Sequence, residues 1–227
     1  MTTMPARESG KGLSRDAYAD AALDFIDAHG VEPLSLRALG NQLGVHATAV
    51  YRHFDSKNEV LEAALQRMLE RENVQIPETG TPREQILALL RGLRDAFRAH
   101  PHMAIPNLTL QDEQATVEFV RYALSLLEQM GLQGDDLVVA YQMLETFSVG
   151  TNAYDWGEYP EGLEGRRRGR RLVGHPAMDT ASRSIETMTE INDRAFELAA
   201  EALLDAVERL GGVDRSAVGV TGSRDRG

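Results

Sequence analysis

Apolar residues recur every three or four positions along almost the whole chain, and this spacing constrains the fold more than any other feature. Tyr18, Ala22, Phe25 and Ile26 fall at i, i+4, i+7 and i+8, which places them on one face of a helix. Residues 180–210 repeat the pattern over a much longer stretch. No alternating run of apolar and polar residues indicates a strand of useful length. The sequence therefore predicts an all-α fold.

Boundary signals divide this pattern into separate helices. Ser56 with Glu59, and Thr81 with Glu84, have the spacing of capping boxes, and Pro82 suits the first position of a helix. Glycine or proline ends most of the periodic stretches. The predicted helices cover residues 14–30, 35–43, 46–54, 56–72, 81–100, 112–130, 135–156 and 180–210.

The sequence IPETG, residues 76–80, interrupts the helical pattern and is predicted to separate two domains. Residues 13–75 form the first domain and residues 76–211 the second. Within the first domain, two short helices joined by a glycine turn and packed beside a longer helix predict a three-helix helix-turn-helix unit. The second domain is predicted to be a larger helical bundle.

Composition excludes several classes of protein. A net charge of −11 and a pI of about 5.0 argue against a chain coated in positive charge for general nucleic-acid binding, although they allow one local basic patch. The absence of cysteine excludes disulfides, thiolate metal ligands and cysteine nucleophiles. No nucleophile turn, phosphate-binding loop or metal cluster is recognised. We therefore assign no catalytic residue, cofactor or metal, and an enzyme is disfavoured.

The chain shows no sign of a membrane segment. No run of about 18 apolar residues is present, so no spanning helix is predicted. Residues 1–12 lack the apolar stretch of a secretory signal. We expect a cytoplasmic protein with no membrane partner, and we expect residues 1–12 and 212–227 to be disordered tails.

The stretch GVHATAVYRHFDSKNEV, residues 44–60, gathers several polar side chains at the predicted helix-turn-helix. The second helix of such a unit enters the major groove of DNA. Tyr51 offers a hydroxyl and Lys57 an ammonium near the N-terminus of the next helix, and both suit a DNA phosphate. Alternatively, Tyr51 and Phe54 belong to the core and Lys57 is a solvated surface charge.

Residues 14–65 resemble the DNA-binding domain of the TetR family of transcriptional regulators, which favours DNA binding over that alternative. The residues that carry the resemblance are Leu39, Leu43, Gly44, Val45, Tyr51, His53, Phe54, Ser56, Lys57 and Leu61. The resemblance implies that Tyr51 and Lys57 bind phosphates and that Ser35 and Arg37 flank the site. The positions that it places at the groove are His46, Ala47, Thr48, Arg52 and His53.

His46 departs from the family pattern, because many members carry serine at this position as the cap of the recognition helix. The departure puts the cap geometry in question, while the imidazole adds a potential base or phosphate contact. Ala47 has only a methyl group to offer a thymine. The acidity of the chain is compatible with a local basic patch if helix 14–30 turns its acids away from DNA. These acids are Asp16, Asp20, Asp24 and Asp27.

The C-terminal half resembles the tetracycline-repressor-like class of this family, through a narrower signal. The residues that keep the spacing of tetracycline repressors without gaps are His100, Glu118, Leu124, Leu127 and Gly131. The resemblance implies that residues 76–211 bind an effector and form a homodimer. Asn107 stands where those repressors place a magnesium-binding histidine, so tetracycline–magnesium is not the predicted effector.

An effector pocket in a helical domain lies between helices and combines an apolar lining with a few polar groups. Tyr141, Glu145, Ser148 and Asn152 follow i, i+4, i+7 and i+11, and so form a polar stripe on an otherwise apolar helix. The stripe faces the pocket, or alternatively solvent or a dimer partner. The residues predicted to hold the effector are His102, Met103, Asn107, Tyr141, Glu145, Phe147 and Asn152.

Two further polar clusters receive structural interpretations. The HPH sequence at residues 100–102 indicates a helix end rather than a metal site, because no acidic partner stands at ligand spacing. The Arg-rich run GRRRGRR, within the polar stretch 157–179, invites a nucleic-acid interpretation. Its glycine content instead predicts a flexible, solvated loop.

Together these features predict a transcriptional regulator that binds double-stranded, palindromic operator DNA as a homodimer. The predicted regulator is a repressor, released from the operator by a small apolar effector. A constitutive DNA-binding regulator without an effector is the alternative. The long helices 135–156 and 180–210 are expected to pair with their copies in a four-helix bundle, because each has more apolar surface than the core of one subunit can use. Small residues on the last helix permit close approach.

Overall fold

The structure, a computed structural model, describes residues 13–75, 77–104, 114–154 and 160–212. Helices provide all the regular secondary structure of these ranges, with no strand among them, which confirms the predicted all-α class. Within the same ranges, no helix is long and apolar enough to cross a membrane. Residues 1–12 and 213–227, which contain nearly all of the expected tails, lie outside the described part of the chain.

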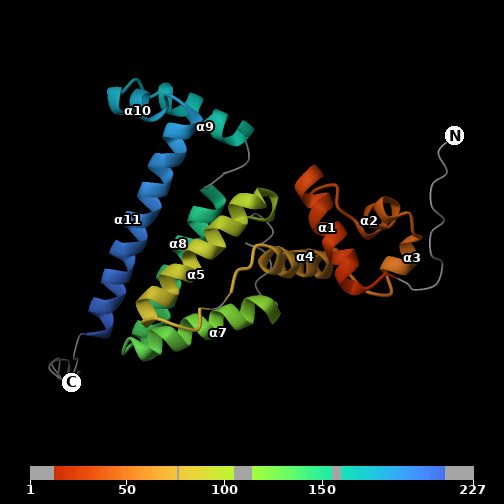
Figure 1. Cartoon of the computed structure of the whole chain (residues 1–227), viewed down its shortest axis with the longest axis horizontal. Coiled ribbons are helices and arrows are strands. Elements are labelled where there is room, and N and C mark those ends of the chain that lie inside the picture. The colour runs from red at the N-terminus through yellow and green to blue at the C-terminus, as the bar shows by residue number, and fades with distance from the viewer. Residues whose placement is uncertain (1–12, 76, 105–113, 155–159, 213–227) are drawn as a thin grey trace, which may run out of the picture.

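The N-terminal helices form one body at one end of the molecule (Figure 1). They are α1 (Arg15–His29), α2 (Leu36–Leu43), α3 (Ala47–Val50) and α4 (Lys57–Arg71). A serine caps α1, α2 and α4, because the hydroxyls of Ser14, Ser35 and Ser56 each accept a backbone N–H three residues further on. The side chains of Leu23, Ile26, Leu39, Val50, Phe54 and Met68 fill the core between these helices.

The turn between α2 and α3 depends on Gly44, whose φ of 64° lies in the left-handed region. The Gly44 N–H donates to the Asn41 carbonyl, and the Val45 N–H donates to the Gly40 carbonyl, which together form a Schellman motif. The third helix is shorter than predicted, since it ends at Val50 and residues 51–53 continue as turns.

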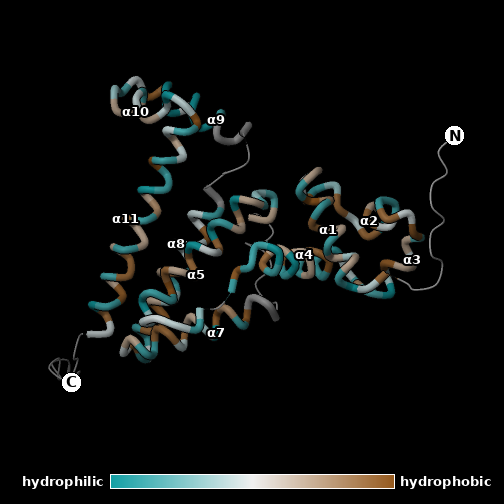
Figure 2. Tube along the Cα trace, viewed as in Figure 1, coloured by the Kyte–Doolittle hydropathy of each residue, from teal (hydrophilic) through white to brown (hydrophobic). Residues whose placement is uncertain are grey.

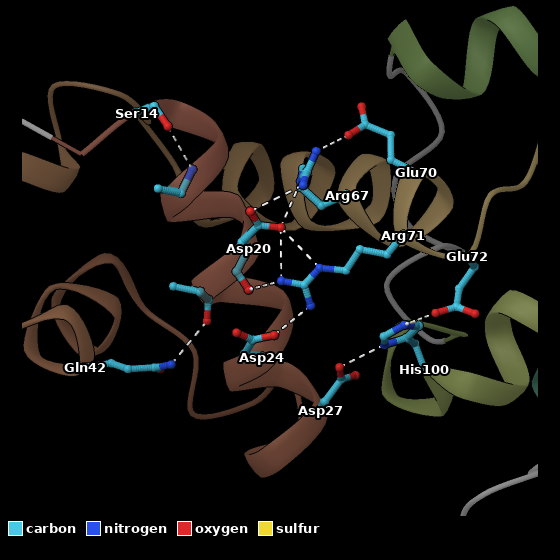
Figure 3. A network of polar contacts seen from close by, with 12 residues as sticks. Ser14, Asp20, Asp24, Asp27, Gln42, Arg67, Glu70, Arg71, Glu72 and His100 are labelled. Atoms are coloured by element: carbon cyan, nitrogen blue, oxygen red, sulfur yellow. Dashed lines mark hydrogen bonds and ion pairs between the residues drawn. The ribbon is translucent and has the colours of Figure 1, made fainter.

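Ion pairs join α1 to α4 (Figure 3). Arg67 contacts both carboxylate oxygens of Asp20, at 2.9 and 3.3 Å, and Arg71 reaches Asp24 at 2.7 Å. The hydrogen bond from Arg67 holds the pKa of Asp20 below its ordinary value of 3.8. Three of the acids expected to turn away from DNA are therefore engaged elsewhere, since Asp27 also has a partner in His100.

The remaining helices lie in the C-terminal half (Figures 1 and 2), and four of them form a second core. The helices of this half are α5 (Pro82–Ala99), the 3₁₀ helix η1 (Pro101–Met103), α7 (Gln114–Gln129), α8 (Gly134–Tyr154), α9 (Pro160–Arg171), α10 (Pro176–Ala181) and α11 (Ile185–Gly211). The predicted capping box at Thr81 and Glu84 is present, with Pro82 at the first position of α5. Helix α5 ends at His100 before Pro101, as predicted.

The prediction of a flexible loop at 157–179 is wrong for the described part of that stretch, which folds into α9 and α10. Prolines begin both helices, and the His175 side chain caps α10. Arg167 pairs with Glu164 one turn earlier on α9. Because arginine favours helix strongly, its repetition offsets the glycines of the run. Helix α11 consequently begins at Ile185, with Ser184 as its cap, rather than near residue 180.

Arginines on α5 face acids on α11 along the length of the contact. The pairs are Arg83 with Glu201, Asp205 and Glu208, Arg91 with Glu197, and both Arg94 and Arg98 with Asp193. The arginine numbers rise as the acid numbers fall, so the two helices are antiparallel. At the C-terminal end of α11, Gly211 approaches the Met130 carbonyl so closely that an added Cβ would lie 2.3 Å from the carbonyl oxygen.

His100 ties the two bodies together (Figure 3). It is buried at the end of α5. Its Nδ1 lies 2.8 Å from Asp27 on α1, and its Nε2 lies 3.2 Å from Glu72, which caps α4. The hydrogen bond with Asp27 raises the pKa of His100 above its ordinary 6.5, although burial opposes the shift. The favoured imidazolium can donate to both carboxylates at once.

We expect His100→Gln to remove a pH-dependent part of the stability. Because the folded-state pKa is raised, the contribution of His100 is complete below pH 6.5 and is lost as pH rises through that higher value. Urea unfolding should show a cost of about 1 to 2 kcal/mol near pH 6 and a smaller cost near pH 8. The control is His29→Gln, at an exposed helix end. Equal costs at both pH values would contradict the role of the imidazolium.

Candidate DNA-binding surface and effector cavity

The residues predicted to contact DNA gather on α2, α3 and the segment that leads into α4. The side chains of Arg37, Thr48 and Arg52 are exposed, and Ala47 is half-buried. Tyr51 is 56% exposed, whereas Phe54 is buried in the core. The alternative that both rings are core therefore holds for Phe54 alone. The surface offers hydroxyl and guanidinium donors, which suit phosphates and base edges.

One histidine lies at each end of the short helix α3, His46 before it and His53 shortly after it. His46 is its N-cap by backbone geometry but makes no capping hydrogen bond with its side chain. Instead, its Nδ1 lies 3.2 Å from the Thr48 hydroxyl. His53 is half-buried, with its ring centroid 5.0 Å from that of Tyr18. In place of a serine cap, His46 and Thr48 therefore present an imidazole and a hydroxyl side by side at the exposed start of α3.

Lys57 has a structural role that the sequence did not indicate. Its ammonium donates to the carbonyls of Val31 at 2.7 Å and Glu32 at 3.3 Å, in the turn between α1 and α2. Pro33 follows directly and has no N–H of its own, which limits the local donors for this turn. Ser35 is likewise engaged as the cap of α2. Two of the three ammonium hydrogens of Lys57 are therefore directed into the protein, and its charge stays beside the surface.

A cavity of about 810 Å³ lies where the two bodies meet, between α4 of the first body and α5, α7 and α8 of the second. Helix α8 supplies its polar side, with Tyr141, Glu145, Ser148 and Asn152 among the lining residues. The predicted polar stripe therefore faces the cavity. Tyr141 donates to Glu145 at 3.1 Å, and burial, reinforced by the charge of Glu145, raises the pKa of Tyr141 to about 12.

Three other residues predicted at the effector site do not line this cavity. Met103 is fully buried in the N-terminal core, and His102 lies beside Gly30. Phe147 stacks on Phe196 with ring centroids 5.4 Å apart, and it lines a smaller hollow of about 300 Å³ against α9 and α11. Asn107 lies outside the described residues. The prediction grouped these residues by proximity along the chain, which does not reveal which helix face is turned toward this cavity.

The apolar wall of the cavity was not predicted. Its residues are Leu65 and Leu69 on α4, Ile86, Leu89, Leu90, Leu93 and Phe97 on α5, and Phe119, Val120 and Ala123 on α7. On α5 the apolar residues spread beyond the single stripe that one core contact requires, and this excess width is the signal that could have indicated a second surface. Among the described residues, no group of His, Asp or Glu is arranged to hold a metal ion.

Comparison with known families agrees with this geometry. Residues 19–64 match the family described as bacterial regulatory proteins of the tetR family. Residues 76–210 match the tetracyclin repressor-like C-terminal domain. The chain belongs to the TetR family. Both halves of the resemblance noted in the sequence are thereby confirmed.

Relatives of this TetR-family chain are transcriptional regulators. Tetracycline repressor protein class A from Escherichia coli is 26% identical over 200 residues, 87% of this chain and 91% of that protein. An HTH-type transcriptional regulator from Saccharopolyspora erythraea is 29% identical over 61% of this chain, and the repressor DrrR1 from Streptomyces coeruleorubidus is 29% identical over 64%. The matches span 59% and 55% of the lengths of the last two proteins.

Solved structures share the fold. A possible TetR family transcriptional regulator from Streptomyces coelicolor has a TM-score of 0.70 at 23% identity, over 87% of this chain and 100% of that one. Apo ActR from the same organism has a TM-score of 0.67 at 22% identity, over 90% and 99%. ActR has also been solved in complex with actinorhodin.

We expect two substitutions on the TetR-like surface to weaken operator binding in different ways. Tyr51→Phe removes an exposed neutral hydroxyl, so it should lower affinity without changing the salt slope or the melting temperature. Lys57→Ala should lower affinity and reduce the slope by about one per subunit. It should also cost about 1 kcal/mol of stability, because two carbonyls lose their donor.

Fluorescence anisotropy on an operator selected from random DNA, repeated over a salt series, measures both effects. Arg121→Ala is the control, since this arginine is exposed on α7 and outside the surface. An unchanged affinity and slope for Lys57→Ala would show that the proposed docking is wrong.

Proposed function

We propose that the chain is a ligand-responsive transcriptional repressor. Residues 13–75 bind a palindromic operator, and residues 76–211 form a homodimer and hold a small effector. The proposed DNA contacts come from α2, α3 and Lys57, and the proposed effector site is the cavity between α4, α5, α7 and α8. The solved complex of ActR with actinorhodin supports a small-molecule role for this fold by analogy.

The observation that carries the proposal is the position of α4 in both parts of the molecule. The helix starts at Lys57, beside the proposed DNA surface, and supplies Leu65 and Leu69 to the cavity wall. Residues 57 and 69 are about 18 Å apart along a helix with a rise of 1.5 Å per residue. A ligand that displaces the cavity end of α4 therefore moves the helices that are packed on its other end.

In this proposal, release from the operator is a shift between two conformations of the dimer, one that can bind the operator and one that cannot. Movement of α4 changes the distance between the two recognition helices, which must match half-sites about one DNA turn apart. An effector needs only a few kcal/mol of preference for the state that cannot bind the operator. The effector can therefore change operator binding without contacting α3.

The proposed dimer uses apolar side chains that α8 and α11 leave exposed. Val138 and Leu198 are each 62% exposed, and Val139 and Ile191 are also exposed. Ala195, Ala199 and Ala202 lie exposed on α11, where small side chains permit close approach of a second helix. A face of this kind, on two adjacent helices, suits a two-fold four-helix contact.

We expect Leu198→Glu to convert the protein into a monomer at micromolar concentration, because it places a charge in the apolar centre of the proposed interface. Sedimentation should then give a mass near 25.0 kDa, and operator affinity should fall by at least about tenfold. The control is Leu172→Glu, at a leucine that is 88% exposed outside these helices. A dimer that persists in Leu198→Glu would exclude the proposed contact.

The chain has no cysteine, so a label attached to a single introduced thiol can occupy the cavity in place of the natural effector. The identity of the natural effector is not needed for this test. Ala123 lines the cavity on α7, and Gln129 is exposed on the same helix. We expect phenylmaleimide on Ala123→Cys to lower operator affinity by about tenfold, which is a typical coupling between two sites. The same label on Gln129→Cys should leave affinity unchanged, as measured by anisotropy.

The alternative function is a constitutive DNA-binding regulator. If a labelled cysteine at position 123 fills the cavity, as mass spectrometry and thermal shift can establish, and operator affinity is unaltered, the cavity is not coupled to DNA. The constitutive alternative would then replace the effector proposal, while the DNA-binding part would remain.

A further inference from the structure

The cavity has an asymmetric lining that restricts the chemistry of its ligand. Leucine and phenylalanine side chains form the walls from α4, α5 and α7, and α8 alone carries the polar groups. Among these, Glu145 is exposed at the rim, whereas Asn152 is buried. The two are seven residues apart, so their backbone positions are separated by about 10 Å along one helix face.

Asn152 has an acceptor that lacks a hydrogen bond. Its side chain is 6% exposed, and its Nδ2 donates to the Ser148 hydroxyl at 3.4 Å. Its Oδ1 is buried and has no partner among the described residues. A buried acceptor that has lost water gains more from a ligand donor than an exposed one does. The position therefore favours a hydroxyl or an N–H over an ether or a carbonyl.

The charges of the cavity lining also favour a ligand that donates hydrogen bonds. Glu145 is the one carboxylate among the described lining residues, and no lysine, arginine or histidine is found there. Tyr141 and Gln142 each donate to Glu145, at 3.1 and 2.9 Å, which holds the carboxylate at the rim. An anionic ligand would be desolvated beside a negative charge with no cation to compensate, whereas a cationic group would pair with Glu145.

From this lining we infer that the cavity selects a largely hydrophobic molecule that donates hydrogen bonds and is neutral or positively charged, and that it rejects organic acids. Asn152 accepts from a donor in the depth of the cavity, and Glu145 receives a second donor or a cationic group at the rim. The inference rests on the effector role proposed above and adds the class of ligand.

Four pyrene derivatives of nearly equal size test the selection, and their fluorescence reports binding directly. Hydroxypyrene is a neutral donor, methoxypyrene lacks the donor, pyrenylmethylammonium is a cation and pyrenecarboxylate is an anion. We expect hydroxypyrene and pyrenylmethylammonium to bind the full-length dimer at least about tenfold more tightly than methoxypyrene, which is the difference made by one good hydrogen bond. Pyrenecarboxylate should bind most weakly.

Two variants assign the selection to its residues. Asn152→Leu should reduce the preference for hydroxypyrene over methoxypyrene to about one, and Glu145→Gln should reduce the preference for the cation over the anion. Both are ratios measured within one protein, so a general loss of stability does not imitate the result. Glu145 is exposed, and its amide variant keeps the shape of the side chain.

Failure of this inference differs from failure of the proposed function. If all four probes bind with equal affinity, or if methoxypyrene or pyrenecarboxylate binds best, the ligand class is overturned while an effector site remains. If the preferences persist in both variants, the assignment to Asn152 and Glu145 is overturned. If no probe binds and the label at position 123 leaves operator affinity unchanged, the effector site itself is lost, and the ligand class with it.

Discussion

The ion pairs between α1 and α4 hold in place the helix on which both parts of the molecule depend. Asp20 and Asp24 bind Arg67 and Arg71 on one side of α4, while apolar residues of α4 are buried in the N-terminal core. Since α4 also supplies part of the cavity wall, it cannot shift alone without breaking charge-assisted hydrogen bonds. In the proposed mechanism, a displacement at the cavity is passed to α1, and with it to α2 and α3, as motion of one body.

Helix α5, on the other side of the cavity from α4, is held mainly by the C-terminal body. Its arginines bind α11 along one side, its leucines line the cavity on another, and His100 at its end reaches both α1 and α4. The cavity thus has one wall tied to the C-terminal body and another wall, α4, that belongs mainly to the N-terminal body. An occupant that separates these walls acts against the His100 contacts, which bridge them at 2.8 and 3.2 Å.

Much of the fold could be predicted because its determinants are local. Caps at Ser56 and Thr81, and the glycine turn at Gly44, act within four residues of sequence, and each was found in the structure. The contacts of Lys57 with carbonyls 25 and 26 residues away could not be read in this way. Nor could the cavity wall, because a leucine that faces a hollow and one that faces a core have the same periodicity. Helix α9 was missed because glycine content outweighed arginine propensity in the prediction, and α10, which has neither residue type, was missed because most of it was assigned to the same polar stretch.

The charge distribution of α11 has a consequence for how the molecule meets DNA. Acids recur along the whole helix, whose own cations are Arg194 and Arg209, and the helix lies at the end of the molecule opposite α2 and α3 (Figure 1). With a net charge of −11, most approaches to a polyanion are repelled. In the proposed docking, Arg37, Arg52 and Lys57 lead the approach, and the excess negative charge of the rest of the chain disfavours other orientations before any contact forms. Long-range repulsion in this way limits unproductive collisions and makes the rate of association depend on ionic strength.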